Sequence, residues 1–136
     1  MNKIFSILIA CLLASSLLPA QDWTRLLIDL HSNQPNKIRS LPNGDFMLCG
    51  VSFNLGLSGS GGFLLRTDPV GNPIWFKTVG DIDGQGDFKN YDRFEDLILT
   101  NDGSIIAVGS QGIPVANAPA HSNLLISKFD LNGTEI

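Results

Sequence analysis

Two pairs of segments match each other along the chain, and this internal repetition constrains the fold more than any other feature of the sequence. Residues 38–50 align with residues 97–109 at an offset of 59. Residues 63–74 align with residues 125–136 at an offset of 62. Self-similarity at a fixed period indicates a structural unit that stacks on its neighbours. The sequence therefore predicts two copies of one unit.

Each copy predicts four antiparallel strands. The apolar runs are short and rich in Ile, Leu, Val and Phe, which favours buried strands over helices. Asn43-Gly44 and Asp102-Gly103 predict hairpins with two-residue type I′ turns. Asp68–Asn72 predicts a further turn, because it holds Pro and Gly at turn-favouring places. The strands expected in the first copy are about 37–41, 45–51, 63–68 and 73–79.

Tandem four-stranded units are typical of β-propellers, in which each sheet is one blade. We predict an all-β fold of β-propeller-like blades, with repeat 1 over about 37–80 and repeat 2 over about 94–136. The Gly/Ser-rich residues 52–62 and the Pro/Ala/Asn-rich residues 110–123 are predicted loops.

The two ends of the repeat region predict how the blades are completed. Trp23-Thr24-Arg25 is similar to Trp75-Phe76-Lys77, so we expect an additional last strand ahead of repeat 1. Repeat 2 stops at Ile136, the equivalent of Ile74, before a fourth strand. Two blades cannot close a ring of four to eight. We therefore expect the chain to be an incomplete part, about two blades, of a larger protein.

The N-terminus has the parts of an export signal. Lys3 supplies a positive charge, and Ile4–Leu18 is an apolar run without charge. This run of about 15 residues is shorter than the ~20 that a membrane-spanning helix needs. We predict a signal peptide over residues 1–20, cut near Ala20, and a repeat region over residues 21–136. The expected location is secreted or on the outer cell surface, without membrane association after cleavage.

The two cysteines and the charge balance narrow the class of protein. The alternative to a cleaved signal is a lipoprotein, because Leu8-Ile9-Ala10-Cys11 fits a loose lipobox. Cys49 is the remaining cysteine, which excludes an intrachain disulfide scaffold and predicts a small core residue. Nine Lys and Arg against thirteen Asp and Glu leave no basic surface for nucleic acid.

A family resemblance is carried by two segments. Residues 64–80, LLRTDPVGNPIWFKTVG, resemble the LxKxDxxGNxxWxKTxGG unit of secreted bacterial β-propeller (SBBP-type) repeat proteins, common in Bacteroidota. Residues 101–110, NDGSIIAVGS, resemble the sDGGfivaGst hairpin of the same family. The resemblance implies a β-propeller on the cell surface that is exported by type IX secretion. It implies no particular activity.

The most pointed candidate for a ligand site is an acidic stretch between the repeats. Asp81, Asp83 and Gln85 fall at positions one, three and five of a calcium loop, and Asp92 falls at position twelve. Gln at position five and Asp at position twelve depart from that pattern. We favour a solvated acidic linker in which Gly and Asp form turns. Calcium is the alternative, and no other cofactor is predicted.

No combination of residues predicts a catalytic site. His31 and His121 lack the spacing of a zinc site. Ser58–Gly62 lacks the hydrolase elbow and the phosphate-loop lysine, so a flexible loop is expected. Glu95 and Asp96 are adjacent in a predicted strand and should face opposite sides, which argues against a shared acid/base pair. Trp23 and Trp75 occupy equivalent places, which favours a packing role.

These observations predict a secreted or cell-surface, non-catalytic repeat protein that acts as a scaffold or adhesive binding module. Its partner is unknown, with surface glycans or proteins as the expected classes. Two alternatives remain at this point. One is the N-terminal part of an extracellular enzyme, such as a propeller-type hydrolase, and the other is a carbohydrate-binding module. Fold alone does not separate them.

Overall fold

The computed structural model describes residues 24–25, 31–54, 60–80, 91–113 and 121–136. Every helix or strand element in these ranges is a strand, which confirms the predicted all-β class. The strands are β1 (His31–Ser40), β2 (Phe46–Asn54), β3 (Ser60–Thr67), β4 (Pro73–Val79), β5 (Arg93–Leu99), β6 (Ile105–Ile113) and β7 (His121–Phe129).

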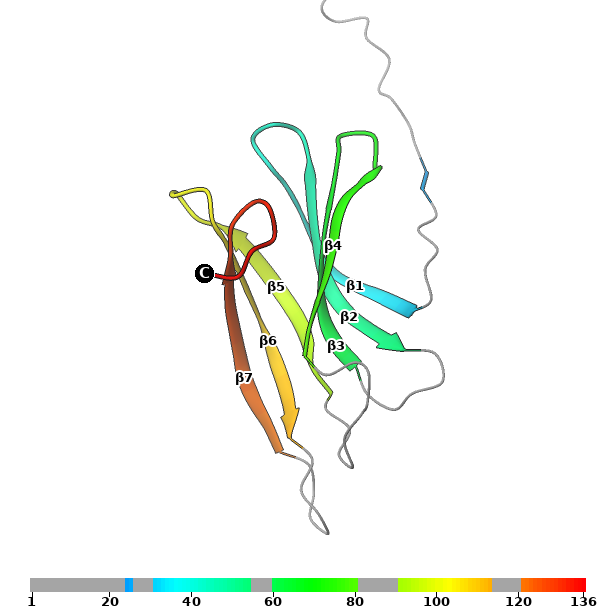
Figure 1. The fold of residues 1–136 in the computed structure, drawn as a ribbon, viewed down its shortest axis with the longest axis vertical. Helices are drawn as coiled ribbons and strands as arrows, with labels where there is room; N and C mark the ends of the chain where they lie inside the picture. Colours follow the sequence, from blue (N-terminus) through cyan, green and yellow to red (C-terminus); the bar gives the residue numbers. More distant parts are fainter. Residues whose placement is uncertain (1–23, 26–30, 55–59, 81–90, 114–120) are drawn as a thin grey trace, which may run out of the picture.

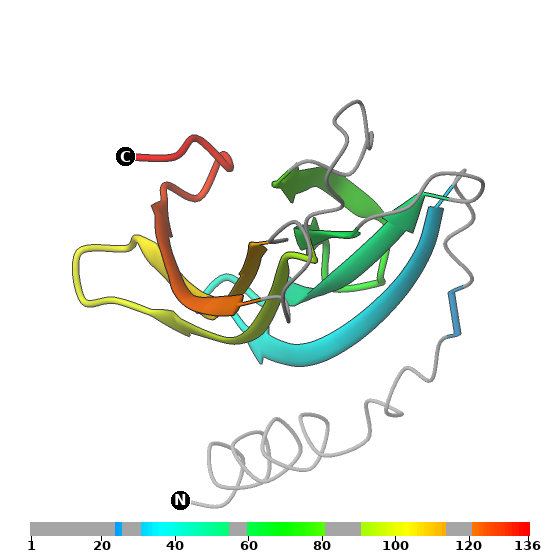
Figure 2. The same cartoon turned by 90° about the horizontal axis from the view of Figure 1, so that it is seen from below.

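The strands form two antiparallel sheets in chain order. One sheet has the order β1-β2-β3-β4 and the other β5-β6-β7 (Figure 1). The sheets lie against each other face to face and do not close into a ring (Figure 2). The chain's last residues begin to pair with β7 through a Phe129–Glu135 bridge, at the place where β4 pairs with β3. The fold is thus a pair of blade-like sheets.

Several strands extend further than the sequence suggested. β2 continues to Asn54 and β3 begins at Ser60, so much of the predicted loop 52–62 is paired strand. A Cβ at Gly62 would lie 2.7 Å from the Phe94 ring. The glycine therefore serves close packing between the sheets rather than loop flexibility. Likewise, β6 reaches Ile113 and β7 begins at His121, inside the predicted loop 110–123.

The predicted additional strand at the N-terminus is not observed at the two residues that can be assessed. Thr24 and Arg25 lie outside any strand, while Trp23 is outside the described residues. Arg25 instead reaches the loop between β3 and β4, where its Nε donates to the Val70 carbonyl at 3.2 Å.

The hairpin loops of both sheets share one geometry. In the loop after β1, the Gly44 N–H donates to the Leu41 carbonyl at 2.9 Å, and Gly44 has a φ of 89°. The same bond recurs at three further glycines with positive φ, namely Gly71, Gly103 and Gly133. Each loop is therefore a turn followed by a left-handed glycine, a three-residue connection. The hairpins are confirmed, but the predicted type I′ turns are wrong, because the glycine follows the turn instead of occupying its centre.

A β-bulge recurs at equivalent positions of the first strand in each sheet. The register shifts at Asn36 in β1 and at Glu95 in β5. Opposite the bulges stand Gly50 and Gly109. A Cβ at either glycine would overlap with a backbone carbonyl, that of Gln34 or that of Arg93. The offset of 59 residues thus corresponds to one backbone arrangement built twice.

The hydrophobic core lies between the two sheets, at an interface that we call the seam. Its buried members come from both sheets and include Leu41, Met47, Cys49, Leu64, Phe94, Leu97, Ile105, Ala107 and Phe129. Cys49 is fully buried, as predicted for a core residue. Burial raises the pKa of its thiol to about 12. A buried thiol of that pKa is a poor nucleophile, so Cys49 is a structural residue.

Candidate functional site

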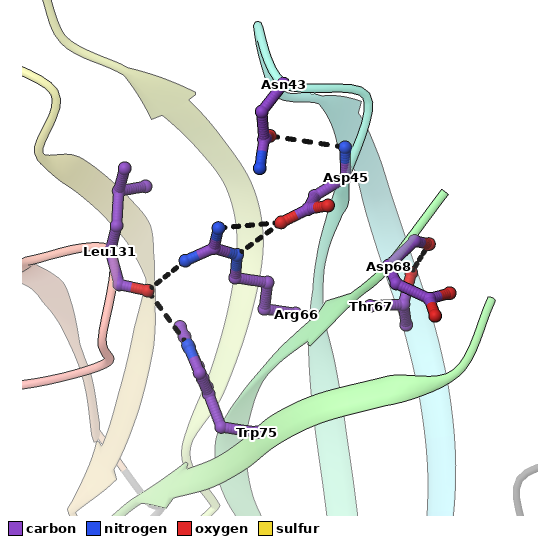
Figure 3. Close-up of polar contacts among 7 residues, drawn as sticks. All are labelled: Asn43, Asp45, Arg66, Thr67, Asp68, Trp75 and Leu131. Atoms are coloured by element: carbon purple, nitrogen blue, oxygen red, sulfur yellow. Dashed lines mark hydrogen bonds and ion pairs between the residues drawn. The ribbon is translucent and has the colours of Figure 1, made fainter. Parts of the chain in front are cut away.

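A mostly buried arginine joins the two sheets at one end of the seam (Figure 3). The Nε and Nη2 atoms of Arg66 in β3 donate to Asp45 Oδ2 at 2.9 and 2.6 Å. Its Nη1 donates to the carbonyl of Leu131, in the loop after β7, at 2.7 Å. Trp75 Nε1 donates to the same carbonyl at 2.9 Å, which confirms a packing role for Trp75. Hydrogen bonding with Asn43 and with Arg66 holds the pKa of the Asp45 carboxyl below its ordinary value.

Charged side chains also join β1 to β5. Lys37 Nζ and Arg39 Nη2 each lie 3.4 Å from a carboxylate oxygen of Asp96. Arg39 Nε donates to the Leu97 carbonyl at 3.2 Å. The backbone N–H of Leu97, together with Lys37 and Arg39, lowers the pKa of the Asp96 carboxyl. These charges are engaged in holding the sheets together, so they are poor candidates for acid/base chemistry.

A cleft of about 220 Å³ lies at the opposite end of the seam. It is open on one side and lies where β1 and β2 meet the start of β5. Polar and aromatic side chains line it together with one valine. The lining residues, which define the seam cleft below, are Gln34, Asn36, Val51, Phe53, Ser60, Tyr91, Arg93 and Glu95.

The polar side chains of the seam cleft are connected to one another. Asn36 Nδ2 donates to the Phe94 carbonyl at 2.7 Å and to Glu95 Oε2 at 3.3 Å. Glu95 Oε1 lies 2.6 Å from Arg93 Nε. Asn36 and Glu95 are the two bulge residues, so the bulges of neighbouring sheets meet at the cleft wall. An amide, a carboxylate and a guanidinium in mutual contact thus line the same cleft.

Backbone bonds fix the remaining wall. The Asp92 N–H donates to the Ser60 carbonyl at 3.0 Å, and Ser60 Oγ donates to the Asp92 carbonyl at 3.1 Å. The Gly112 N–H donates to the Tyr91 carbonyl at 3.1 Å. Tyr91 is thereby held between β3 of one sheet and β6 of the other. Its side chain is about half exposed and available to a ligand.

The seam cleft suits a small polar ligand with an apolar face. Its volume is below the range of about 300–1,000 Å³ that is common for drug-sized ligands. An aromatic ring next to planar amide, carboxylate and guanidinium groups offers both a stacking surface and directional hydrogen bonds. A single sugar ring combines these two needs, because it has apolar C–H faces and hydroxyl edges.

The predicted calcium ligands fall mostly where the structure gives no description. Asp81, Asp83 and Gln85 lie outside the described residues. Asp92 is buried immediately before β5, beside Gly80, where a Cβ would overlap with its carboxylate. Among the described residues, no three His, Cys, Asp or Glu side chains are grouped so that they could hold a metal ion. The calcium loop stays a prediction.

Other candidates from the sequence can be placed. His121 is exposed at the start of β7. Glu95 and Asp96 do not alternate as predicted, because the bulge at Glu95 puts two residues between the buried Phe94 and Leu97. Both carboxylates therefore reach β1, but they contact different side chains there.

The sequence did not bring the residues of the seam cleft together, because Glu95 stood out only as half of a rejected acid/base pair and Ser60 only as part of a predicted loop. The alignment of the two copies began at Ile38 and Leu97, just after the bulges. Extending it by two residues would have paired Asn36 with Glu95. The signal in the sequence was that Asn36 and Glu95, both polar, occupy equivalent positions, and that Gly50 and Gly109 are equivalent as well.

Comparisons with protein-family models, curated proteins and solved structures give no match to this chain. The resemblance to SBBP-type repeats thus remains a prediction from the residues that carry it. Within the described part of the chain, no apolar helix of membrane-spanning length is present.

Proposed function

We propose that the chain is a secreted or cell-surface, non-catalytic repeat protein that acts as a scaffold or adhesive binding module. The observation that carries this proposal is the seam cleft, an open site built where the bulges of two stacked sheets meet. Its aromatic and planar polar lining suits the binding of a surface glycan. The SBBP-type resemblance supports the same function and a β-propeller architecture.

The use of charged side chains supports a non-catalytic role. Arg66, Arg39 and Lys37 are engaged in contacts between the sheets. Asp68 and Asp130 accept backbone N–H bonds inside the hairpin loops. General acid/base catalysis requires a group placed to exchange protons with a substrate. Groups committed to structural bonds with lowered carboxyl pKa values are unsuited to that task.

Glycan binding to the purified chain tests the proposal. We expect the chain to bind a subset of glycans on an array. Tyr91→Ala should reduce that binding about tenfold, a loss of about 1.4 kcal/mol, because it removes the aromatic stacking surface of the cleft. Glu95→Gln should weaken binding as well, since it alters the bonds to Asn36 and Arg93. The matched control is Glu135→Gln, which changes the same group outside the cleft.

Two results would contradict the proposal. One is the absence of binding across the array by a correctly folded chain. The other is binding that Tyr91→Ala and Glu95→Gln leave at the level of Glu135→Gln. Thermal melting of each variant separates a lost site from a lost fold.

A further inference from the structure

The seam cleft carries one charge of each sign. Arg93 and Glu95 are the charged side chains among the described residues that line it, so the lining has no net charge. The two side chains contact each other, with Arg93 Nε 2.6 Å from Glu95 Oε1. Both are about half exposed, so a ligand in the cleft can reach them. The cleft therefore presents a neutralised ion pair and not an isolated charge.

The carboxylate of Glu95 keeps capacity for further hydrogen-bond donors. Its Oε1 contacts Arg93, and its Oε2 accepts from Asn36 Nδ2 at 3.3 Å. Each carboxylate oxygen has two lone pairs, so each can accept one more hydrogen bond. An ionised carboxylate has no proton to donate. A ligand group that bonds to Glu95 must therefore be a donor.

The donors of the cleft lie beside this acceptor. In the described part of the chain, the Arg93 side chain makes its polar contact through Nε, which leaves Nη1 and Nη2 as donors for a ligand. Gln34 adds an amide with two donor hydrogens and an acceptor oxygen. A ligand that bonds to Glu95 and to Arg93 together must offer donors and acceptors side by side.

We propose, on the basis of the glycan binding proposed above, that the seam cleft selects an uncharged sugar ring and that Glu95 excludes acidic sugars. Neighbouring hydroxyls of a sugar both donate and accept, so one can donate to Glu95 while the next accepts from Arg93. A carboxylate on the ring, as in a uronic acid, only accepts, and it would lie close to the negative charge of Glu95. Such a contact between like charges disfavours the wrong partner.

The charge of the whole chain acts in the same direction. Nine Lys and Arg against thirteen Asp and Glu give a formal net charge of −4. A negative net charge lowers the local concentration of anionic ligands and leaves an uncharged sugar unaffected. Salt screens this long-range repulsion, whereas Glu95 acts at close range inside the cleft. The two contributions can therefore be separated by comparing a charge removed inside the cleft with one removed outside it.

Binding of matched glycans to the purified chain tests the inference. Each neutral glycan that binds on the array is compared with the counterpart in which its hexose is replaced by the corresponding uronic acid. We expect the wild-type chain to bind the neutral member about fivefold more tightly or better, the effect of like charges about 4 Å apart in water. Glu95→Gln should raise the binding of the acidic member about fivefold, because the charge of Arg93 is then no longer neutralised.

Two further variants show whether the charge inside the cleft is responsible. Glu135→Gln removes the same charge outside the cleft, so it should leave the preference for the neutral member unchanged. Arg93→Gln added to Glu95→Gln should abolish the gain for the acidic member, because no cation then remains in the cleft lining.

The outcomes for this inference and for the proposed function are distinguishable. A wild-type chain that binds the acidic members as tightly as the neutral ones would overturn the inference and leave glycan binding intact. A Glu95→Gln chain that is folded by its thermal melt and gains nothing for the acidic members would also overturn it. The absence of binding to both members would overturn the proposed function, and this inference with it.

Discussion

The two sheets have the same strand pairing and opposite burial at equivalent positions. Leu64 and Ile126 correspond to each other, yet Leu64 is fully buried and Ile126 is 59% exposed. Ile38 and Leu97 show the reverse. The difference arises because the second sheet covers one face of the first and no described residue covers its own equivalent face in the same way. The burial of a residue thus depends on whether another sheet covers its face, while the strand pairing is set within each sheet.

The ion pairs of the two sheets differ for the same reason. Arg66 at the seam pairs with Asp45, and both side chains are mostly buried. Its equivalent in the second sheet is Lys128, which pairs with Asp102 at 2.9 Å on an exposed surface. A buried guanidinium with several acceptors joins elements, whereas an exposed ammonium pair contributes little. The comparison predicts which substitutions lower the stability of the fold and which leave it nearly unchanged.

The largest effect is expected at the glycines opposite the bulges. Gly50→Ala and Gly109→Ala should each lower the free energy of unfolding by about 3 kcal/mol, because the new Cβ overlaps with a backbone carbonyl that cannot move aside. Similar losses in the two sheets would show that the bulge is one device used twice. Chemical denaturation measures both.

The control for the bulge glycines is Gly103→Ala, where a Cβ meets open space and only the left-handed φ of 79° resists it. It should cost about 1 kcal/mol. A loss at Gly109→Ala no greater than at Gly103→Ala would contradict the role of the close approach.

The second largest effect separates the seam from the exposed outer face of the second sheet, on which Ile126 lies. Leu64→Ala should destabilise the chain by about 3 kcal/mol, because it leaves a cavity in the core. Ile126→Ala at the equivalent position should change the stability by about 0.5 kcal/mol or less. Both are measured by denaturation at concentrations where the chain is monomeric. Equal losses would show that the two faces are covered alike.

A smaller difference is expected between the two ion pairs. Arg66→Ala removes the donor from Asp45 and from the Leu131 carbonyl, so it should lower the melting temperature clearly. Lys128→Ala should leave the melting temperature almost unchanged. Thermal unfolding of both variants gives the comparison, and a Lys128→Ala loss as large as that of Arg66→Ala would argue against it.

The smallest effect concerns acid stability. The backbone N–H groups of Thr134 and Asn132 lower the pKa of the Asp130 carboxyl. Burial raises the pKa of the Asp68 carboxyl, but the Asn72 side chain and the backbone N–H groups of Asn72 and Val70 outweigh it and lower that pKa. Carboxyls with lowered pKa values in the folded state add stability that is present above about pH 4, the unfolded value, and is lost as the pH falls through the folded value.

Stability of the wild-type chain should therefore fall below about pH 4. Asp68→Asn and Asp130→Asn should each make this fall shallower, by similar amounts, because the two loops are equivalent. A pH series of denaturation curves measures the slope. Curves for the variants that parallel the wild type would contradict the assigned bonds.

The sequence was sufficient for the fold class and the hairpins, because alternating apolar runs and loop glycines are local signals. It was insufficient for the ends of the strands. Gly62 looks like loop composition and lies in β3, since the packing of Phe94 on it is a contact between sheets.

The candidate site depended on contacts that no local pattern reveals. Asn36 and Glu95 meet only because two bulges align across the seam. The bulge also breaks the alternation on which the placement of Glu95 and Asp96 relied. Of the predicted calcium ligands, Asp92 alone lies in the described residues, as a buried side chain.

The central claim is that one face of the first sheet is covered at the seam while its equivalent on the second sheet is open. Thiol labelling of Ile126→Cys, with mass mapping of the labelled peptides, tests it directly. The account predicts rapid labelling at position 126 and labelling of Cys49, the direct neighbour of Leu64 at the seam, only upon unfolding. Labelling of Cys49 in the folded monomer as fast as position 126 would contradict it.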